Sequence, residues 1–233
     1  MNGHLLLAGG AEFGGRMVRA DQRAIHLAGG LGAPIRIIPA AAAVDNNHIH
    51  AGNNGVRWFT SLGAMDVASL PLIDRASADQ TEIAEELRSA RLMYMLGGSP
   101  EHLYRSLAGS LSWEAILDAY QAGAVIGGSS AGAMVLCEHY FNPQTHEIAA
   151  GLNLVPNAAV IPHYNNLKGR WLGELRAGLP EAVLIGIDEK TGMIDDGAEG
   201  EGDWTVYGGG QVTLNHRDAS IIYIPGDSFD LAE

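Results

Sequence analysis

Short apolar runs alternate with longer segments of helical character over the first 140 residues of the chain. Each run ends in glycine or other small residues, and the segment after it carries apolar residues every three to four positions. This alternation predicts parallel strands connected by helices. The predicted strands are 4–8, 34–39, 66–73, 91–96 and 124–127. Because these runs are apolar throughout, helices are expected to cover both faces of their sheet.

The segments between the strands carry helix signals. The predicted helices are 16–28, 46–62, 79–90, 100–107 and 112–122. Ser77, followed three residues later by Gln80, has the pattern of a capping box for the third of them. Ser99 followed by Pro100 predicts an N-cap with proline at the first helical position.

The pattern changes beyond about residue 140. A further helix is predicted at 168–178, whereas 182–225 consists of short apolar runs separated by glycine and aspartate turns. We expect these runs to add antiparallel strands to the one central sheet. No low-complexity linker or fixed repeat divides the chain, so residues 1–233 are predicted to form a single α/β domain. Its sheet should be mostly parallel and flanked by helices.

Composition and charge exclude several classes of protein. The net charge is −13 and the only lysines are Lys168 and Lys190, so no basic stripe could neutralise the phosphates of a nucleic acid. No apolar run is long enough to span a membrane. The single cysteine, Cys137, excludes an internal disulfide, and the first 15 residues lack the pattern of a signal peptide. A cytoplasmic location is therefore expected.

The most informative stretch is AVIGGSSAGAMVL at residues 124–136, which contains a G-x-S-x-G motif centred on Ser130. An apolar strand that turns sharply into a helix holds its central residue in a strained conformation and requires small neighbours. This context predicts that the Ser130 hydroxyl stands above the carboxyl ends of the strands as a nucleophile. The alternative is a glycine-rich turn that only lets the helix pack closely.

A serine nucleophile needs a base and a group that orients the base. Of the nine histidines, His163 ends the apolar run in NAAVIPHYNN and His216 follows QVTLN. The other seven are expected on solvated surfaces: His4, His26, His48, His50, His102, His139 and His146. Asp188 and Glu189 follow the run IGI, and spacing alone leaves both open as the orienting acid, or as turn residues.

Acyl transfer also requires donors for a developing oxyanion. The backbone N–H of Ala131, directly after the nucleophile, is one candidate, and the Gly97-Gly98 loop after the fourth strand is the other. His48 and His50 form an HxH pair without a third ligand at a recognisable spacing. No metal and no other cofactor is therefore expected, and a chelator should not change activity.

Three blocks of the sequence carry a family resemblance: LLLAGGAE, YMLGGS through AVIGGSSAGAM, and IPHYNN followed by IGIDE. Over nearly its whole length the chain resembles the dipeptidase E and cyanophycinase family of serine peptidases, whose fold is similar to that of class I glutamine amidotransferases. The resemblance implies Ser130 as nucleophile, His163 as base and Glu189 as orienting acid. It also implies the N–H groups of Gly98 and Ala131 as oxyanion donors.

The chain departs from the family pattern at two places. Glu12 is followed by Phe13-Gly14, where cyanophycinases usually have Asp-Lys. After Gly97-Gly98 it has Ser99-Pro100, where the family tends to place Asp-Gln or Asn-Thr. These positions border the substrate. The resemblance therefore supports the assignment of the catalytic residues more directly than it supports a particular substrate specificity.

The resemblance implies small aspartyl peptides as substrates, and a guanidinium matches a carboxylate bidentately. Arg170, seven residues after His163 in the arginine-bearing stretch of similar proteins, is predicted to bind that carboxylate. Gly97, Ser99 and Asn165 complete the predicted substrate-binding set.

The function predicted from the sequence is a serine peptidase that hydrolyses small peptides through an acyl-enzyme. One alternative is an α/β-hydrolase-like esterase, which would use Ser130, Glu189 and His216. Another is a noncatalytic binding protein with an amidotransferase-like fold. A glutaminase is disfavoured, because Cys137 lies seven residues beyond the elbow serine. The expected partner is a small peptide, not nucleic acid or a membrane, and the oligomeric state is left open, a homodimer included.

Overall fold

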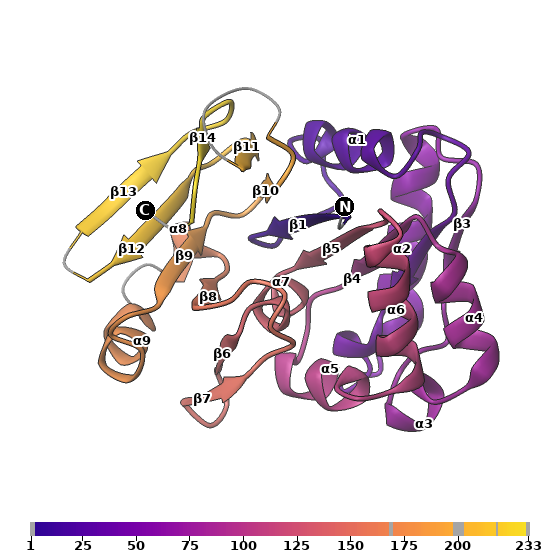
Figure 1. The fold of residues 1–233 in the computed structure, drawn as a ribbon, viewed down its shortest axis with the longest axis horizontal. Coiled ribbons are helices and arrows are strands. Elements are labelled where there is room, and N and C mark those ends of the chain that lie inside the picture. The colour runs from indigo at the N-terminus through magenta and orange to yellow at the C-terminus, as the bar shows by residue number, and fades with distance from the viewer. Residues whose placement is uncertain (1–2, 168–169, 198–202, 218, 232–233) are drawn as a thin grey trace.

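Five parallel strands form the centre of the computed structural model, which describes residues 3–167, 170–197, 203–217 and 219–231 (Figure 1). In spatial order these strands are β1 (His4–Ala8), β5 (Val125–Ser129), β4 (Leu92–Met95), β2 (Ile35–Ile38) and β3 (Val67–Ser69). Four of them fall within the predicted runs, and β5 starts within the run 124–127 but extends two residues beyond it. β3 is shorter than predicted because Pro71 has no N–H to continue a ladder.

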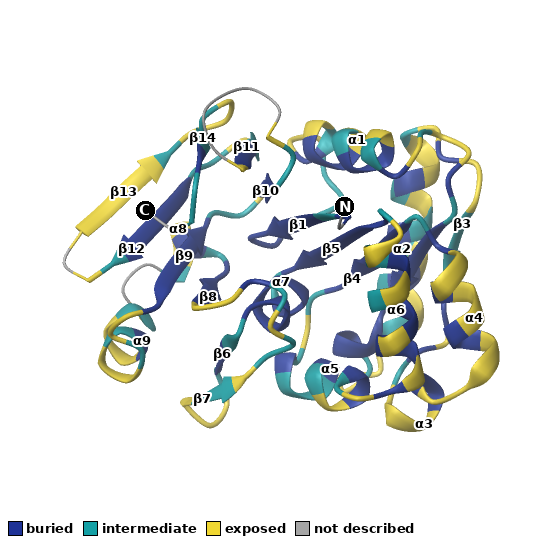
Figure 2. Ribbon diagram, in the orientation of Figure 1, coloured by how far each residue is buried: buried dark blue, intermediate teal, exposed yellow. Residues whose placement is uncertain are grey.

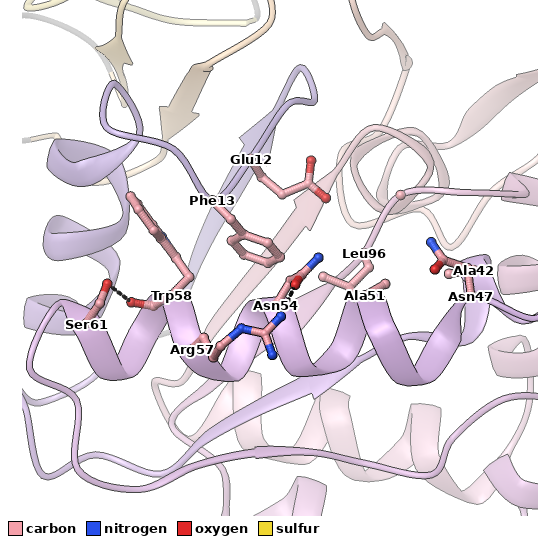
Figure 3. Close-up of a pocket in the computed structure, with 11 residues that line it drawn as sticks. Glu12, Phe13, Ala42, Asn47, Ala51, Asn54, Arg57, Trp58, Ser61 and Leu96 are labelled. Atoms are coloured by element: carbon pink, nitrogen blue, oxygen red, sulfur yellow. Dashed lines mark hydrogen bonds between the residues drawn. The ribbon is translucent and has the colours of Figure 1, made fainter.

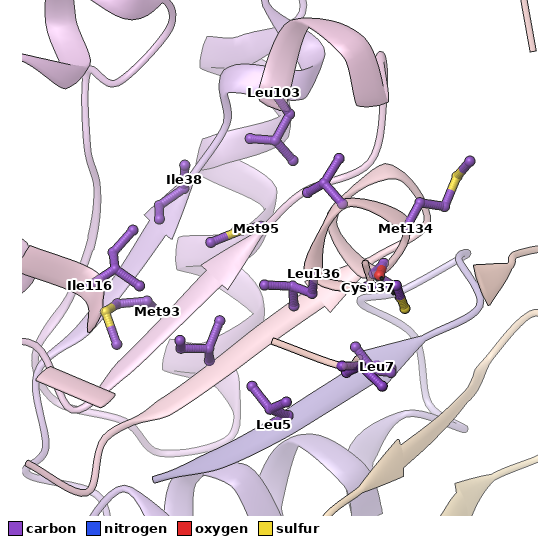
Figure 4. Packing of buried hydrophobic residues seen from close by; sticks show 14 of the residues in the cluster. Leu5, Leu7, Ile38, Met93, Met95, Leu103, Ile116, Met134, Leu136 and Cys137 are labelled. Carbon is purple, nitrogen blue, oxygen red and sulfur yellow. Dashed lines mark hydrogen bonds between the residues drawn. The ribbon is translucent and has the colours of Figure 1, made fainter. Parts of the chain in front are cut away.

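Helices cover both faces of this sheet, as predicted. The helices of this region are α1 (Val18–Leu27), α2 (His48–Ser61), α3 (Arg75–Ala78), α4 (Thr81–Ser89), α5 (Pro100–Leu107), α6 (Leu111–Gln121) and α7 (Ala131–Leu136), with the 3-10 turn η1 (Ala40–Ala42). Leu5 and Leu7 belong to the core cluster under α4 to α7 (Figure 4), whereas Leu6 and Ala8 pack with α1 and α2. Strands β1, β5, β4 and β2 are almost entirely buried, whereas the edge strand β3 is half-buried (Figure 2). The predicted mostly parallel α/β fold is confirmed.

The predicted start of the third helix is wrong in detail. Asp74, not Ser77, is the N-cap, and its carboxylate accepts a hydrogen bond from the Ser77 N–H at 2.8 Å. Ser77 lies at the third helical position, where its hydroxyl accepts from the Asp74 N–H in return. The capping box therefore starts the short α3 one turn earlier, and α4 follows as a separate helix. The predicted N-cap of α5 is confirmed, because Ser99 Oγ accepts from the His102 N–H at 3.2 Å.

The C-terminal strands do not all join the central sheet, contrary to the prediction. β10 (Thr191–Ile194), β11 (Trp204–Gly208) and β14 (Ser228–Phe229) extend it antiparallel beside β1. A second sheet has the order β13 (Ala219–Tyr223), β12 (Val212–His216), β9 (Val183–Ile187) and β8 (Ala158–Ile161), with β8 and β9 parallel. The chain crosses between the sheets at Asp188, whose N–H donates to the Gln211 carbonyl at 3.1 Å and so keeps β9 beside β12.

The remaining elements connect α7 to β9. β6 (His139–Asn142) and β7 (Glu147–Ala150) form a two-stranded hairpin. α8 (Tyr164–Leu167) and α9 (Leu172–Gly178) follow β8. The predicted helix 168–178 thus begins later than expected, and its residues 168–169 lie outside the described part of the chain. Within the described ranges, no helix combines the length and the apolar character needed to cross a membrane.

Candidate active site

The elbow serine lies where the motif predicts. Ser130 joins the end of β5 to the start of α7 and has φ +50° and ψ −111°, a left-handed conformation that non-glycine residues rarely adopt. A Cβ on Gly128 would lie 2.5 Å from the carbonyl carbon of Gly132, so strand and helix approach too closely for a larger residue. The Ser130 N–H donates to the Ala8 carbonyl at 3.0 Å, which anchors the turn to β1.

His163 follows β8 and faces the elbow. Its Nε2 lies 3.1 Å from Ser130 Oγ, and its backbone N–H donates to the Gly9 carbonyl at 2.7 Å. Like Ser130, it has a positive φ, of +49°. The close contact with the loop after β1 requires glycine at position 10, because a Cβ there would lie 2.3 Å from the imidazole Cε1.

Glu189, not Asp188, contacts the histidine. Its Oε1 lies 2.9 Å from His163 Nδ1, and its backbone N–H donates to Asn165 Oδ1 at 3.1 Å. The hydrogen bond with His163 is the main cause that lowers the pKa of the Glu189 carboxyl, so the group stays ionised. Asp188 Oδ2 instead accepts from the Gln211 N–H. A carboxylate at Nδ1 favours the tautomer whose Nε2 accepts a proton from a serine.

His216 lies at the far end of the second sheet. Asn215 of β12 pairs with Leu184 of β9, so the following His216 is level with the start of β9, whereas Glu189 comes after its end. The four steps from Val183 to Ile187 along β9 alone span about 13 Å. The structure therefore brings Ser130 and Glu189 together with His163 and not with His216.

The loop after β4 runs next to the nucleophile. A Cβ on Gly97 would lie 3.3 Å from Ser130 Cβ and 3.8 Å from its Oγ. Ala131 is the first residue of α7, a position whose N–H has no intrahelical acceptor. The two predicted sources of oxyanion donors thus flank Ser130, and the roles of Gly98 and Ala131 as donors stay predictions.

The predicted substrate-binding residues have different surroundings. Ser99 caps α5 through its hydroxyl, and Asn165 holds the backbone of Glu189. Arg170 is exposed in the turn before α9, where its side chain makes no hydrogen bond or ion pair with the described residues. Their contact with substrate remains a prediction.

The described residues include no group of three histidine, cysteine, aspartate or glutamate side chains arranged to hold a metal ion. Cys137 is buried at the end of α7, and burial raises the pKa of its thiol to about 12. It is therefore an uncharged core residue and not a thiolate nucleophile.

The comparison with known proteins decides the family. The model of peptidase family S51 matches residues 5–198, most of the chain. The chain belongs to peptidase family S51. It is a serine peptidase with an α/β fold.

Curated relatives and solved structures agree with this assignment. A cyanophycinase of Geminocystis herdmanii is 32% identical over 199 residues, 80% of this chain and 72% of the relative. A cyanophycinase of Synechococcus elongatus is 29% identical over 231 residues, 94% and 70% of the two chains. The crystal structure of a peptidase from an acI-B1 actinobacterium, 29% identical, superposes with a TM-score of 0.84 over 97% of this chain and 96% of its own. A putative peptidase E of Listeria monocytogenes, 18% identical over 96% and 98% of the chains, shares the fold with a TM-score of 0.60.

Beside the serine of this S51 peptidase lies a cavity of about 560 Å³, which we call the α2 cavity (Figure 3). Its walls are Glu12, Phe13, Ala42, Asn47, Ala51, Asn54, Arg57, Trp58, Ser61, Leu96 and Gly97. Sequence reasoning missed the contribution of α2. A signal was present, since positions 47, 51, 54, 58 and 61 recur every three to four residues and form one helix face.

The loop between β1 and α1 forms another wall of the α2 cavity. Ala11 and Phe13 have positive φ of 51° and 61°, and the Phe13 ring lies 5.7 Å from the ring of Tyr94 and 6.5 Å from that of Trp58. Glu12 Oε2 accepts a hydrogen bond from Ser129 Oγ at 2.8 Å. The departure from the family pattern at Phe13 therefore lies on a cavity wall, and Glu12 is held next to the elbow.

A buried carboxyl supports the cavity from behind. Asp21 Oδ2 accepts from Trp58 Nε1 at 2.7 Å, while Oδ1 has no partner among the described residues. Burial raises the pKa of Asp21 to about 7, the Trp58 hydrogen bond opposes the shift, and the charge of Glu12 adds to it.

Asp21 is expected to make stability fall as pH rises. The unfolded chain releases this proton near pH 4 but the folded chain only near pH 7, so folding becomes less favourable across that interval. Asp21→Asn keeps an oxygen for Trp58 and cannot ionise. The free energy of unfolding of the wild type, relative to this variant, should drop by roughly 2 to 4 kcal/mol between pH 4 and 8 in denaturant titrations. Equal pH dependence in both proteins would contradict the assignment. Burial also raises the pKa of Asp195 to about 7. Because Asp195 is present in the wild type and in Asp21→Asn, its contribution to the pH dependence cancels in the comparison.

Proposed function

We propose that this S51 peptidase hydrolyses small aspartyl peptides through an acyl-enzyme formed on Ser130. The observation that carries the proposal is the continuous chain of contacts from Ser130 Oγ to His163 Nε2 and from His163 Nδ1 to Glu189, at 3.1 and 2.9 Å. Such a chain can deprotonate a hydroxyl that is otherwise a weak nucleophile.

The first half of the reaction forms the ester. Ser130 Oγ attacks the carbonyl carbon of the scissile peptide bond and passes its proton to His163 Nε2. The oxygen of the tetrahedral intermediate accepts hydrogen bonds from the N–H groups of Gly98 and Ala131. The carbon–nitrogen bond then breaks, and His163 gives the proton to the leaving amine.

The second half regenerates the enzyme. Water replaces the amine and gives a proton to His163 as its oxygen attacks the ester carbonyl, and the proton returns to Ser130 Oγ when the acid leaves. In both halves the Glu189 carboxylate stabilises the imidazolium and fixes its orientation. Its lowered pKa supports this role, because it keeps the carboxylate charged when the imidazole is protonated.

The aspartyl specificity rests on the resemblance to dipeptidase E and cyanophycinases. The curated relatives named cyanophycinase support it, and so does the arginine on the wall of the α2 cavity in a chain with few cations. A noncatalytic binding protein would not require the two strained backbone positions at Ser130 and His163.

A panel of peptides tests the proposal. Asp-Leu is expected to be hydrolysed with a kcat/KM at least tenfold above those of Asn-Leu and Ala-Leu, because only Asp-Leu has a carboxylate on the side chain of its first residue. An isoaspartyl dipeptide and cyanophycin, assayed beside them by amine release, locate the natural linkage. Equal rates on the three dipeptides would remove the aspartyl specificity, and no hydrolysis of any substrate would favour the binding-protein alternative.

A further inference from the structure

The order of the strands places the nucleophile between its base and the α2 cavity. His163 contacts the glycines after β1, Ser130 follows β5, and Gly97 follows β4. These strands are neighbours in the order β1, β5, β4 and β2, and α2 packs on β2 and β3 beyond them. The cavity therefore opens on the side of Ser130 that is away from His163.

This arrangement indicates on which side of Ser130 each half of a peptide substrate binds. The leaving amine must receive its proton from His163, so it lies on the histidine side. The acyl half then extends past Gly97 into the α2 cavity. This step rests on the proposed function, since it uses the acyl-enzyme route.

Among the described residues that line the α2 cavity, Arg57 is the one with a positive side chain. In Figure 3 Arg57 and Asn54 lie side by side on α2 and face the cavity, and Arg57 Nη2 donates a hydrogen bond to Asn54 Oδ1. That bond orients the guanidinium and leaves the amide nitrogen of Asn54 as a further donor. Arg57 has no carboxylate partner among the described residues, so the remaining N–H groups of its guanidinium are available to bind an anion.

Glu12 is the one negative side chain among the lining residues that the structure describes. Figure 3 shows it across the cavity from α2, and the Ser129 hydroxyl donates a hydrogen bond to one of its oxygens. None of the described cations pairs with it. The strained loop at Ala11 and Phe13 holds this carboxylate against Ser129, the residue before the nucleophile.

We propose that Arg57 and Glu12 determine specificity by binding the two charges of an N-terminal aspartyl residue. The side-chain carboxylate binds Arg57 and the amide of Asn54, and the free α-ammonium binds Glu12. The α-ammonium is the nearer of the two charges to the scissile carbonyl, and Glu12 is hydrogen-bonded to Ser129, the residue before Ser130. An internal aspartyl residue has no ammonium, so this cavity selects exopeptidase action. Arg170, which follows His163 on the leaving-group side, is not the residue that binds the aspartyl carboxylate.

Single variants assayed on three substrates test the proposal. With Asp-Leu, Arg57→Ala should lower kcat/KM about 10- to 100-fold, and the preference for Asp-Leu over Asn-Leu should fall toward one. Arg57→Lys should retain more of this preference than Arg57→Ala but less than the wild type, because an ammonium cannot donate two parallel hydrogen bonds to a carboxylate as a guanidinium does. Glu12→Gln, which keeps an oxygen for Ser129, should reduce the discrimination against N-acetyl-Asp-Leu at least tenfold.

Arg88→Ala, a surface arginine paired with Asp118 on another face, is the matched control and should keep the wild-type preference. The proposal is overturned if Arg57→Ala keeps the wild-type preference, or if Arg170→Ala abolishes it instead. Thermal unfolding of each variant separates lost binding from lost fold.

Binding of free L-aspartate, measured by calorimetry, separates this proposal from the proposed function. Wild type should bind L-aspartate more tightly than L-asparagine or N-acetyl-L-aspartate, and Arg57→Ala should weaken L-aspartate binding at least tenfold. Such binding without hydrolysis of any peptide would refute the peptidase reaction and leave the binding site standing. Hydrolysis of Asp-Leu with equal affinity of Arg57→Ala and wild type for L-aspartate would refute the site alone.

Discussion

Ser130→Ala is expected to lower kcat by about 10³- to 10⁶-fold while the protein folds normally. The substitution removes the oxygen that would form the ester, and it changes the side chain by one atom. Alanine meets the same positive φ at the elbow as serine, so the turn should persist. Hydrolysis of Asp-Leu by the purified variant, with its thermal unfolding temperature as the check on folding, measures the effect.

Covalent labelling gives an independent readout of the same assignment. A serine-directed phosphonate should modify Ser130, located by mass spectrometry of the digested protein. Ser129 is the matched comparison, because it is adjacent in sequence but is buried with its hydroxyl bound to Glu12. A wild-type rate in Ser130→Ala, or an adduct on Ser129 alone, would refute Ser130 as the nucleophile.

The candidate triad could be predicted because each member ends an apolar strand. Ser130 follows β5, His163 follows β8 and Glu189 follows β9, and the carboxyl ends of these strands meet. Spacing could not separate Asp188 from Glu189, since both follow the same strand. Their difference depends on Gln211, a residue that precedes β12 and is remote in sequence.

The division of the C-terminal strands between two sheets could not be predicted. The runs from 182 to 225 have similar composition, and period-two patterns do not identify the partner of a strand. The partners come from opposite parts of the chain: Met193 of β10 pairs with Leu7, whereas Ile187 of β9 pairs with Val212. Whether a run pairs with β1 depends on contacts between distant parts of the chain, and this pairing decides which sheet the run joins.

The spacing along α2 reveals a helix face, but it does not show that this face lines a cavity. The polar residues Asn54 and Arg57 on α2 have the spacing of an ordinary solvated helix face. They become a cavity wall only because Phe13, more than 40 residues earlier, packs against Trp58 in a loop with positive φ. No local pattern encodes that contact.

His163→Ala is expected to lower kcat by about 10⁴- to 10⁶-fold, whereas His216→Ala should stay within a few-fold of the wild type. A general base must lie within hydrogen-bond reach of the proton it accepts, and His163 Nε2 lies 3.1 Å from Ser130 Oγ. His216 is level with the opposite end of β9. Steady-state kinetics on Asp-Leu measures both variants, and the reverse ranking would support the esterase order.

Two further measurements distinguish a base from a merely structural histidine. Added imidazole should restore part of the activity of His163→Ala by occupying the vacated space, and the restored rate should rise with the fraction of neutral imidazole as pH increases. The double variant Ser130→Ala, His163→Ala should be no slower than Ser130→Ala alone, because residues that act as one unit have non-additive effects. Losses that multiply in the double variant would mean that His163 contributes to activity independently of Ser130, and the proposed proton transfer between them would be wrong.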